Sequence, residues 1–443
     1  MKVISGRAAV MFIFIGLFVF GLLFFTGDYV SNAGKWVKYP YNQHIYVNGQ
    51  PKVGTIYDRN GLVLAKTQGN KRVYNSDEAI RTAMMPAIGD SGGNVATGAQ
   101  VVFASKLSGW NLIEGAFAAD RSGKDVKLTL DAKLCSTAYQ ALAGRSGAVG
   151  VYNYKTGEIL CMVSSPSFDP QNPPDVKANA SKYKGVYVNR FLSSAFTPGS
   201  VFKLVTSAAA IDTIPDIDNM SWNCTGSTTI NGGKLTCSEV HGKVNFSEAL
   251  TGSCNIAFGQ IAIKLGAANL EKYADKAGFN SSMDIDGIKT AAGNVSVKNS
   301  DLLALAWAGV GQSTDTANPA SFMAYLGAIA NGGVRVTPHL LTTTKSSSTR
   351  VLSSSTAAKL SSMMRANVVN GYGDDNYSGL KLCAKTGTAE VNGKQPNAWF
   401  VGYLDRTDYP LAFVVVVENG GWGISTAGPI ANTVLQQAVN GNG

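Results

Sequence analysis

A turn that leads directly into an apolar run, at Pro198 to Ile211, constrains the fold of this chain more than any other stretch. The Pro198-Gly199 dipeptide is typical of a turn, and the alanine-rich run after it predicts a buried helix. Ser200 and Lys203 are three residues apart, so both side chains project from one face near the start of that helix, where unpaired N–H groups favour negative charge. A lysine with a lowered pKa can deprotonate a serine, so the stretch predicts an activated nucleophile.

Two further motifs follow in the chain, Ser253-Cys254-Asn255 and Lys385-Thr386-Gly387. Each of the three motifs also has a second copy elsewhere: Ser181-Lys182-Tyr183-Lys184 in a polar stretch, Ser221-Trp222-Asn223, and Lys155-Thr156-Gly157, whose flanks predict a hairpin turn. The set that begins at Ser200 has the order and the surroundings of the motifs of penicillin-binding proteins and serine β-lactamases. The chain therefore resembles that superfamily, and the second copies are interpreted as chance matches.

The N-terminal residues predict a membrane anchor. Lys2 and Arg7 precede an apolar run, Ala8 to Phe25, that is just long enough to span a bilayer. Bulky residues lead into Thr26-Gly27-Asp28 without the small-residue pattern of a cleavage site, so we expect an uncleaved single-pass anchor. The positive residues predict a cytoplasmic N-terminus in a bacterial cell membrane, with everything after Asp28 outside the cytoplasm.

The segment after the anchor carries a second resemblance. Val53 to Gly61 is similar to the Arg-Gly-x-Ile-x-Asp-Arg-Asn-Gly signature of class B penicillin-binding proteins, with Val53 in place of the first arginine. We assign no chemistry to this signature and interpret it as part of a scaffold. The predicted organisation is an anchor with its cytoplasmic tip at 1–27, a small pedestal at 28–124 and a transpeptidase domain at 125–443.

The distribution of predicted elements indicates an α+β fold. Two strands joined at the Lys155 turn follow a helix at Ala132–Ala143, and the last strands, at Trp399–Tyr403 and Leu411–Glu418, come before a closing helix at Thr426–Ala438. Strands at both ends of the domain and helices between them predict a sheet packed between helix groups. The resemblance implies the serine β-lactamase-like transpeptidase fold, with a mainly antiparallel sheet.

The resemblance also implies an activity, that of a peptidoglycan D,D-transpeptidase, and gives roles to the motif residues. Ser200 attacks the penultimate D-Ala of a D-Ala-D-Ala stem peptide to form an acyl-enzyme, and Lys203 is its general base. Ser253 relays a proton to the leaving group, while Lys385 anchors a carboxylate and lowers the pKa of Lys203. An amine from a second stem peptide then completes the cross-link, and β-lactams are expected to block the serine.

Substrate recognition is expected from the same motifs. The resemblance implies that Asn255 holds a side-chain amide of the substrate, that Thr386 and Thr388 offer hydroxyls to its terminal carboxylate, and that Gly387 lies between them. The backbone N–H groups of Ser200 and Thr388 are the implied oxyanion hole.

Three alternative functions share these motifs: a serine β-lactamase, a membrane-anchored β-lactam sensor and a non-catalytic scaffold for a glycan polymerase. The anchor and pedestal argue against the first, and the complete reactive set argues against the last. Class B relatives lack a glycan-polymerising domain, so the resemblance implies a separate SEDS-family polymerase as partner. The chain has a net charge of +9 but no lysine or arginine run, so we expect no nucleic-acid partner.

Histidine and cysteine positions predict no metal site, and we expect no cofactor. The histidines are His44, His241 and His339, and none shows a partner at ligand spacing; His241 is expected to satisfy loop backbone. Cys224 and Cys237 bracket the turn-like Asn231-Gly232-Gly233 and are the candidate disulfide pair. The remaining cysteines are interpreted as free buried thiols: Cys135, Cys161, Cys254 and Cys383.

Overall fold

The structure is a computed structural model and describes residues 2–36, 53–69, 71–108, 110–111, 116–117, 124–391 and 393–441. Helix α1 (Lys2–Trp36) includes a stretch, Gly6–Asn32, with a mean hydropathy of 2.8 and no burial against the rest of the chain. Among the described residues it is the one helix long and apolar enough to cross a membrane, as predicted. His44 lies outside the described residues.

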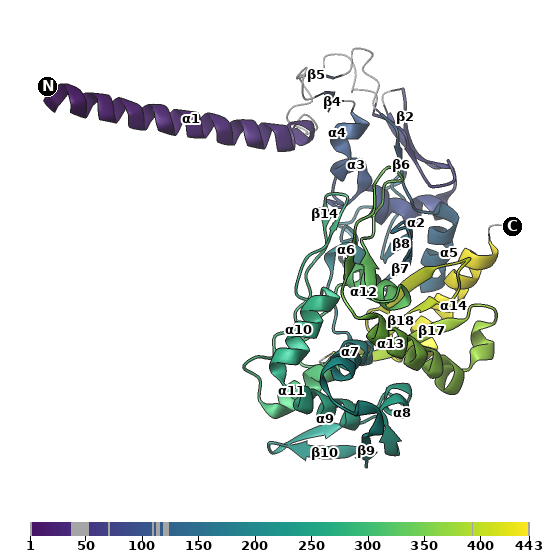
Figure 1. The fold of residues 1–443 in the computed structure, drawn as a ribbon. Coiled ribbons are helices and arrows are strands. Elements are labelled where there is room, and N and C mark those ends of the chain that lie inside the picture. The colour runs from purple at the N-terminus through teal and green to yellow at the C-terminus, as the bar shows by residue number, and fades with distance from the viewer. Residues whose placement is uncertain are drawn as a thin grey trace.

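A five-stranded antiparallel sheet forms the centre of the molecule, with strand order β17-β18-β19-β7-β8 (Figure 1). Its strands are β7 (Gly147–Asn153), β8 (Ile159–Ser165), β17 (Leu382–Val391), β18 (Lys394–Leu404) and β19 (Leu411–Val417). Every residue of the valine-rich β19 is buried, because helices cover both faces of the sheet. The predicted α+β fold, with early and late strands in one antiparallel sheet, is confirmed.

Two groups of helices enclose the sheet. Helices α5 (Ala132–Leu142) and α14 (Gly423–Asn440) pack against each other and on its strands, together with α2 (Glu78–Ile88). Helix α12 (Pro319–Ala330) packs on β7, β18 and β19, and Tyr152 of β7 donates a hydrogen bond to the Ala324 carbonyl of α12 at 3.3 Å. A Cβ at Gly327 would stand 1.7 Å from the Tyr152 hydroxyl oxygen, so only glycine permits this close approach.

Between β8 and β17 the chain forms a helical region with several small hairpins, which includes α7 (Lys203–Thr213), whose first eight residues are all buried. The other helices of this part are α6 (Arg190–Ser193), α8 (Phe246–Thr251), α9 (Asn255–Leu265), α10 (Ala267–Ala277), α11 (Leu302–Gly309) and α13 (Ser354–Asn367), with single turns at Gly199–Phe202, Ile217–Asn219, Val368–Tyr372 and Asp374–Tyr377. The short strands are β9 (Ser221–Cys224), β10 (Ser227–Ile230), β11 (Gly233–Thr236), β12 (Gly242–Asn245), β13 (Asp284–Ile285), β14 (Ile288–Lys289), β15 (Val334–Val336) and β16 (Ser348–Arg350). Strand β9 pairs with β12, and β10 pairs with β11.

The predicted pedestal contributes three strands to a separate four-stranded sheet, β3-β2-β1-β6, at the opposite end of the molecule from β9 and β10 (Figure 1), and the fourth strand, β6, comes after residue 124. The elements of this part are β1 (Ile56–Tyr57), β2 (Val63–Gln68), β3 (Lys71–Tyr74), β4 (Trp110–Asn111), β5 (Ala116–Phe117), β6 (Val126–Lys127), α3 (Ala99–Val102) and α4 (Ala104–Leu107). Its buried residues join the same hydrophobic core as the central sheet, and α2 packs on α5 and β8. The boundary at residue 124 stays a prediction.

Asp58 connects the two parts. Its carboxylate is buried and accepts hydrogen bonds from the N–H groups of Asn60 and Leu62, both at 2.8 Å, and from that of Ala132 at 3.3 Å. Ala132 is the first residue of α5, so one side chain closes the turn at Asn60 and also satisfies a free N–H of that helix. This arrangement supports the interpretation of the signature as scaffold.

Replacement of Asp58 by asparagine is predicted to destabilise the protein. All three contacts of the carboxylate come from N–H donors, so an amide NH2 must face a donor in either orientation. We expect a loss of about 1–3 kcal/mol in the free energy of unfolding, measured by urea denaturation. Asp218→Asn, which breaks an exposed ion pair with Lys359, is the control and should cost less than about 1 kcal/mol. Equal losses in the two variants would contradict the proposed role of Asp58.

Candidate active site

Ser200 lies in a tight turn that is fixed by glycines. Gly199 has φ +57° and donates its N–H to the Gly311 carbonyl at 2.8 Å. A Cβ at Gly199 would come within 3.0 Å of the Ala389 Cα on β17, and one at Gly311 within 2.2 Å of the Gly199 oxygen. These close approaches place the half-buried Ser200 beside strand β17, one 3-10 turn before α7 begins. The predicted turn and buried helix are confirmed.

The amine of Lys203 is the centre of the site. Its side chain is fully buried, and Nζ lies 3.2 Å from Ser200 Oγ, 2.5 Å from the Ser253 carbonyl oxygen, 3.1 Å from Ser253 Oγ and 2.8 Å from Asn255 Oδ1. Removal from water disfavours the charged amine and lowers the pKa of Lys203 to about 7, against a smaller opposing effect of the Cys237 and Cys254 sulfurs. A substantial fraction of Lys203 is therefore neutral near pH 7.

A neutral Lys203 matches this set of neighbours. Two of its contacts, the Ser253 carbonyl and Asn255 Oδ1, can only accept hydrogen bonds, so they take both N–H bonds of the amine. The lone pair is then left for a hydroxyl proton, from Ser200 at 3.2 Å or from Ser253 at 3.1 Å. This is the geometry of a nucleophile with its general base.

The backbone at Ser253 is held in an uncommon conformation. Ser253 has φ +56°, in the left-handed region that few non-glycine residues adopt. It joins α8, whose N-terminus carries a capping box between Asn245 and Glu248, to α9, which Cys254 caps. The two helices and this conformation turn both the carbonyl and the hydroxyl of Ser253 toward Lys203.

Lys385 approaches Ser253 from the sheet. It is fully buried on β17, and its Nζ donates to Ser253 Oγ at 3.0 Å and to the Thr386 carbonyl at 3.0 Å. Burial, with a further contribution from the nearby Lys203 charge, lowers the pKa of Lys385 well below its usual value. The Ser253 hydroxyl thus lies between two amines, and the structure brings together the predicted residues Ser200, Lys203, Ser253, Asn255 and Lys385.

Of the predicted substrate-binding residues, Thr386, Gly387 and Thr388 lie on β17, and Asn255 begins α9. Asn255 uses one Nδ2 hydrogen on the Thr236 carbonyl and keeps the other for a ligand. A Cβ at Gly387 would come within 2.9 Å of the Pro198 oxygen, so glycine lets β17 approach the Ser200 turn. The Thr388 hydroxyl accepts the Gly423 N–H at 3.2 Å and can donate its own proton elsewhere.

Tyr372 was not identified from the sequence. Its hydroxyl accepts the backbone N–H of Thr386 at 3.1 Å and lies 3.3 Å from Thr386 Oγ1. Burial raises the pKa of Tyr372, so the phenol stays neutral and orients the Thr386 hydroxyl. It belongs to the π-helical turn Val368–Tyr372, and its one sequence signal was an aromatic residue between glycines.

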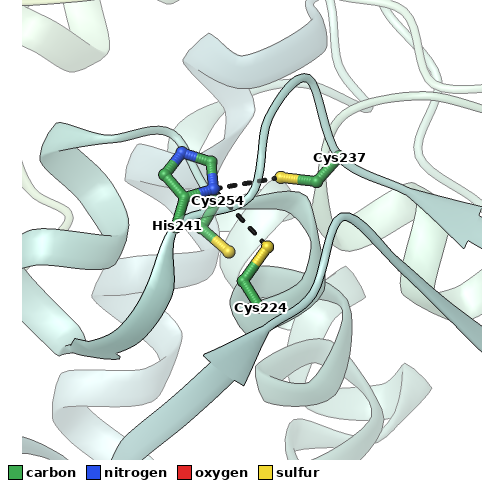
Figure 2. Close-up of side chains that lie close together, drawn as sticks. All are labelled: Cys224, Cys237, His241 and Cys254. Atoms are coloured by element: carbon green, nitrogen blue, oxygen red, sulfur yellow. Dashed lines mark hydrogen bonds between the residues drawn. The ribbon is translucent and has the colours of Figure 1, made fainter.

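Two predictions about cysteine and histidine are wrong. Cys224 and Cys237 are free thiols in the structure, not a disulfide, because both turn toward His241 Nδ1, at 3.5 and 3.4 Å (Figure 2). The expectation that no histidine has a partner at ligand spacing also fails, since Cys224, Cys237 and Cys254 all lie around His241. His241 does bind loop backbone as predicted, at the Gly252 carbonyl, but through its other ring nitrogen. Cys135, Cys161, Cys254 and Cys383 are buried free thiols, as predicted.

The second copies of the three motifs lie elsewhere. Ser181–Lys184 belongs to a turn region on the surface, Ser221–Asn223 lies in β9, and Lys155–Gly157 forms the turn between β7 and β8. Their interpretation as chance matches is confirmed for the part of the chain that the structure describes.

Comparison with known proteins agrees with this geometry. Residues 147–436 match the family model described as "Penicillin binding protein transpeptidase domain". The chain is 29% identical over 378 residues to the peptidoglycan D,D-transpeptidase PbpA of Mycobacterium tuberculosis, a match that covers 76% of this chain and 77% of that protein. It is 25% identical over 370 residues to the peptidoglycan D,D-transpeptidase MrdA of Escherichia coli K12, across 72% of this chain and 58% of that protein.

Solved structures are similar in fold. Penicillin-binding protein A of M. tuberculosis superimposes with a TM-score of 0.78 at 26% identity, over 88% of this chain and 100% of that chain. Its ceftriaxone acyl-enzyme complex gives 0.77 at 26% identity, over 88% and 98%. The D,D-transpeptidase domain of a peptidoglycan glycosyltransferase from Eggerthella lenta gives 0.75 at 28% identity, over 89% and 100%.

The pKa of Lys203 predicts how reaction of Ser200 with a β-lactam depends on pH. The base must be neutral to accept the serine proton, so the acylation rate constant should rise through a midpoint near pH 7 and level off above it. Between pH 6 and pH 8 the neutral fraction of a group with this pKa grows about tenfold, and the rate should follow. Stopped-flow acylation by a chromogenic cephalosporin measures it. A flat profile, or a rate that still rises steeply above pH 9, would contradict a neutral Lys203.

Proposed function

Because the chain belongs to the penicillin-binding protein transpeptidase family, we propose that it is a peptidoglycan D,D-transpeptidase that cross-links stem peptides through an acyl-enzyme on Ser200. The observation that carries the proposal is the 3.2 Å contact between Ser200 Oγ and the buried Lys203 amine, whose other hydrogen bonds go to carbonyl oxygens. Relatives named peptidoglycan D,D-transpeptidases, and β-lactam acyl-enzyme complexes of M. tuberculosis penicillin-binding protein A, support it.

In the acylation step the Ser200 oxygen forms a bond to the carbonyl carbon of the penultimate D-Ala, and its proton moves to Lys203. The carbonyl oxygen gains negative charge, and we assign the N–H groups of Ser200 and Thr388 as its donors. Removal of one such donor costs about 3–4 kcal/mol of transition-state stabilisation in other enzymes. Contact of β17 with the Ser200 turn supports this pairing.

Departure of the terminal D-Ala requires a proton on its amine, and Ser253 is well placed to supply it. Its hydroxyl lies 3.1 Å from Lys203 Nζ and 3.0 Å from Lys385 Nζ, so a proton can pass from Lys203 through Ser253 to the leaving amine. The amine of a second stem peptide then attacks the ester carbonyl, gives up its proton by the reverse route and releases Ser200. The product is a peptide cross-link.

Recognition of the stem peptide rests on β17 and Asn255. The hydroxyls of Thr386 and Thr388, next to the Lys385 charge, provide donors for the terminal carboxylate. Tyr372 fixes the first of these hydroxyls. The free Nδ2 hydrogen of Asn255 suits a peptide carbonyl of the donor strand.

We also propose a membrane orientation and a membrane partner for the enzyme. Lys2 and Arg7 favour a cytoplasmic N-terminus for α1, which places the catalytic domain outside the cytoplasm. Similarity to class B proteins favours a SEDS-family glycan polymerase as membrane partner. Site-specific cross-linking of the full-length chain in bacterial membranes tests this partner, and failure to capture a polymerase through α1 would count against it.

Labelling with a fluorescent penicillin tests the nucleophile. Full-length protein should take up one label per chain, and Ser200→Ala should take up none, because Ser200 is the proposed nucleophile and Ser253, the other described serine beside Lys203, is assigned a proton-relay role. Ser181→Ala is the matched control and should label normally, since Ser181 belongs to the exposed second copy of the motif. Label retained by Ser200→Ala would refute the assignment, and release of the label within seconds would favour a β-lactamase.

Two arginine substitutions separate the lysines. An arginine stays protonated, so Lys203→Arg removes the base, and acylation should fall by about 10²- to 10⁴-fold. Lys385→Arg keeps a positive charge near the carboxylate site and should retain more activity. Acylation rate constants with one β-lactam decide between the roles. A greater loss at Lys385 would mean that the base is Lys385.

A further inference from the structure

Three cysteines and a histidine gather beside the active site, on segments that are separate in the chain. Cys224 ends β9, Cys237 follows β11, His241 precedes β12, and Cys254 caps α9. One donor atom from each, three sulfurs and a ring nitrogen, all lie within 4.8 Å of one another (Figure 2). Cys224 and Cys254 are fully buried, and the other two are partly buried.

The spacing of these atoms is that of a tetrahedral zinc site. With Zn–S of about 2.3 Å and Zn–N of about 2.05 Å, two ligands of a tetrahedron are about 3.6 Å apart when one is sulfur and the other nitrogen. His241 Nδ1 lies 3.5 Å from Cys224 Sγ and 3.4 Å from Cys237 Sγ. One ring nitrogen at this distance from two sulfurs matches two edges of such a tetrahedron.

The ring of His241 is held in the tautomer that binds metal. Its Nε2 lies 2.7 Å from the Gly252 carbonyl oxygen, which can only accept, so the ring proton is on Nε2. The lone pair of Nδ1 therefore faces the sulfurs. A backbone carbonyl in this position is the usual orienting partner of a metal-binding histidine.

Two of the three sulfurs accept backbone N–H donors, whereas Cys224 Sγ lies 3.6 Å from the Glu239 carbonyl oxygen. Cys237 Sγ accepts the Asn255 N–H at 3.1 Å, and Cys254 Sγ accepts the Ala257 N–H at 3.5 Å. Such N–H donors stabilise negative sulfur. A disulfide between Cys224 and Cys237 would use only two of the three sulfurs and would leave the Nδ1 lone pair without a partner.

We propose that Cys224, Cys237, His241 and Cys254 bind one Zn²⁺ ion in a closed, structural site. Binding releases three thiol protons, and four protein ligands leave no position for water, so the ion does no chemistry. Cys254 lies between Ser253 and Asn255, and the Asn255 N–H donates to Cys237, so the ion anchors the two residues that hold the Lys203 amine. The metal site is independent of the proposed function, whereas this anchoring role rests on it.

Metal content of the full-length protein, purified in detergent without chelators, tests the site. Mass spectrometry of the metals should give one zinc per chain, and cobalt exchange should give the spectrum of a tetrahedral thiolate complex. Cys135→Ala, which removes a buried cysteine outside the cluster, should keep the zinc. Substoichiometric zinc even after incubation with zinc and a reductant, or a Cys224–Cys237 disulfide in peptides mapped without reduction, would overturn the proposal.

A pair of variants at Cys224 tests the anchoring role. Cys224→Asp keeps an anionic ligand for zinc but cannot form a disulfide, so it should keep the metal and most of the acylation rate. Cys224→Ala should lose the zinc, and acylation by penicillin should slow by on the order of 10- to 100-fold as Ser253 and Asn255 shift. Removal of zinc from the unmodified protein should slow acylation, and restoring the zinc should recover the original rate. This measurement needs no substitution, so it tests the anchoring role even if a variant misfolds.

The outcomes separate the two proposals. Loss of zinc in Cys224→Ala with an unchanged acylation rate would overturn the anchoring role and leave the metal site. A full zinc content and an unchanged acylation rate in both the alanine and the aspartate variant would overturn both. A protein that contains zinc but never reacts with penicillin would refute the proposed function, and with it the anchoring role, and would leave the metal site.

Discussion

Burial of the Lys203 amine without a carboxylate beside it is the constraint on which the rest of the site depends. Its described neighbours are two carbonyl oxygens and two hydroxyls, which return less free energy to an ammonium than water does. The neutral amine is therefore accessible near neutral pH, and its lone pair can accept a proton from the Ser200 hydroxyl or from the Ser253 hydroxyl. A carboxylate in place of either carbonyl would stabilise the ammonium and remove the base.

The position of the Lys203 amine therefore depends mainly on the segment Ser253–Asn255, which supplies three of the four contacts to Nζ. A left-handed serine costs about 1–2 kcal/mol and persists only where its surroundings determine it. The capping box of α8, the Cys254 cap of α9 and the cysteine–histidine cluster all act on this one segment. The proposed zinc thus lies where rigidity is needed, and the pairing of β9 with β12 and of β10 with β11 brings its proposed ligands there.

The fold and the reactive residues could be predicted because their signals are local or ordered. Helical spacing places Ser200 and Lys203 on one face, and the three motifs keep their order along the chain. The turn at Asn231-Gly232-Gly233 is also predicted correctly, but its position between Cys224 and Cys237 suggested a disulfide. That inference failed because the sequence does not show that β12 pairs with β9 and places His241 beside both thiols. Tyr372 was not identified as a site residue for a related reason. An irregular π-helical turn, and not a periodic pattern, brings its side chain to Thr386.

The two buried lysines share one hydroxyl, and their surroundings decide which of them carries charge. Two buried ammonium groups on either side of Ser253 Oγ repel each other, so protonation of one opposes protonation of the other. Lys385 lies on the strand that presents Thr386 and Thr388, where a substrate carboxylate would stabilise its positive charge. Lys203 faces carbonyls and the nucleophile. In the proposed mechanism, substrate binding would therefore draw the charge to Lys385 and leave Lys203 neutral at the moment when Ser200 must lose its proton.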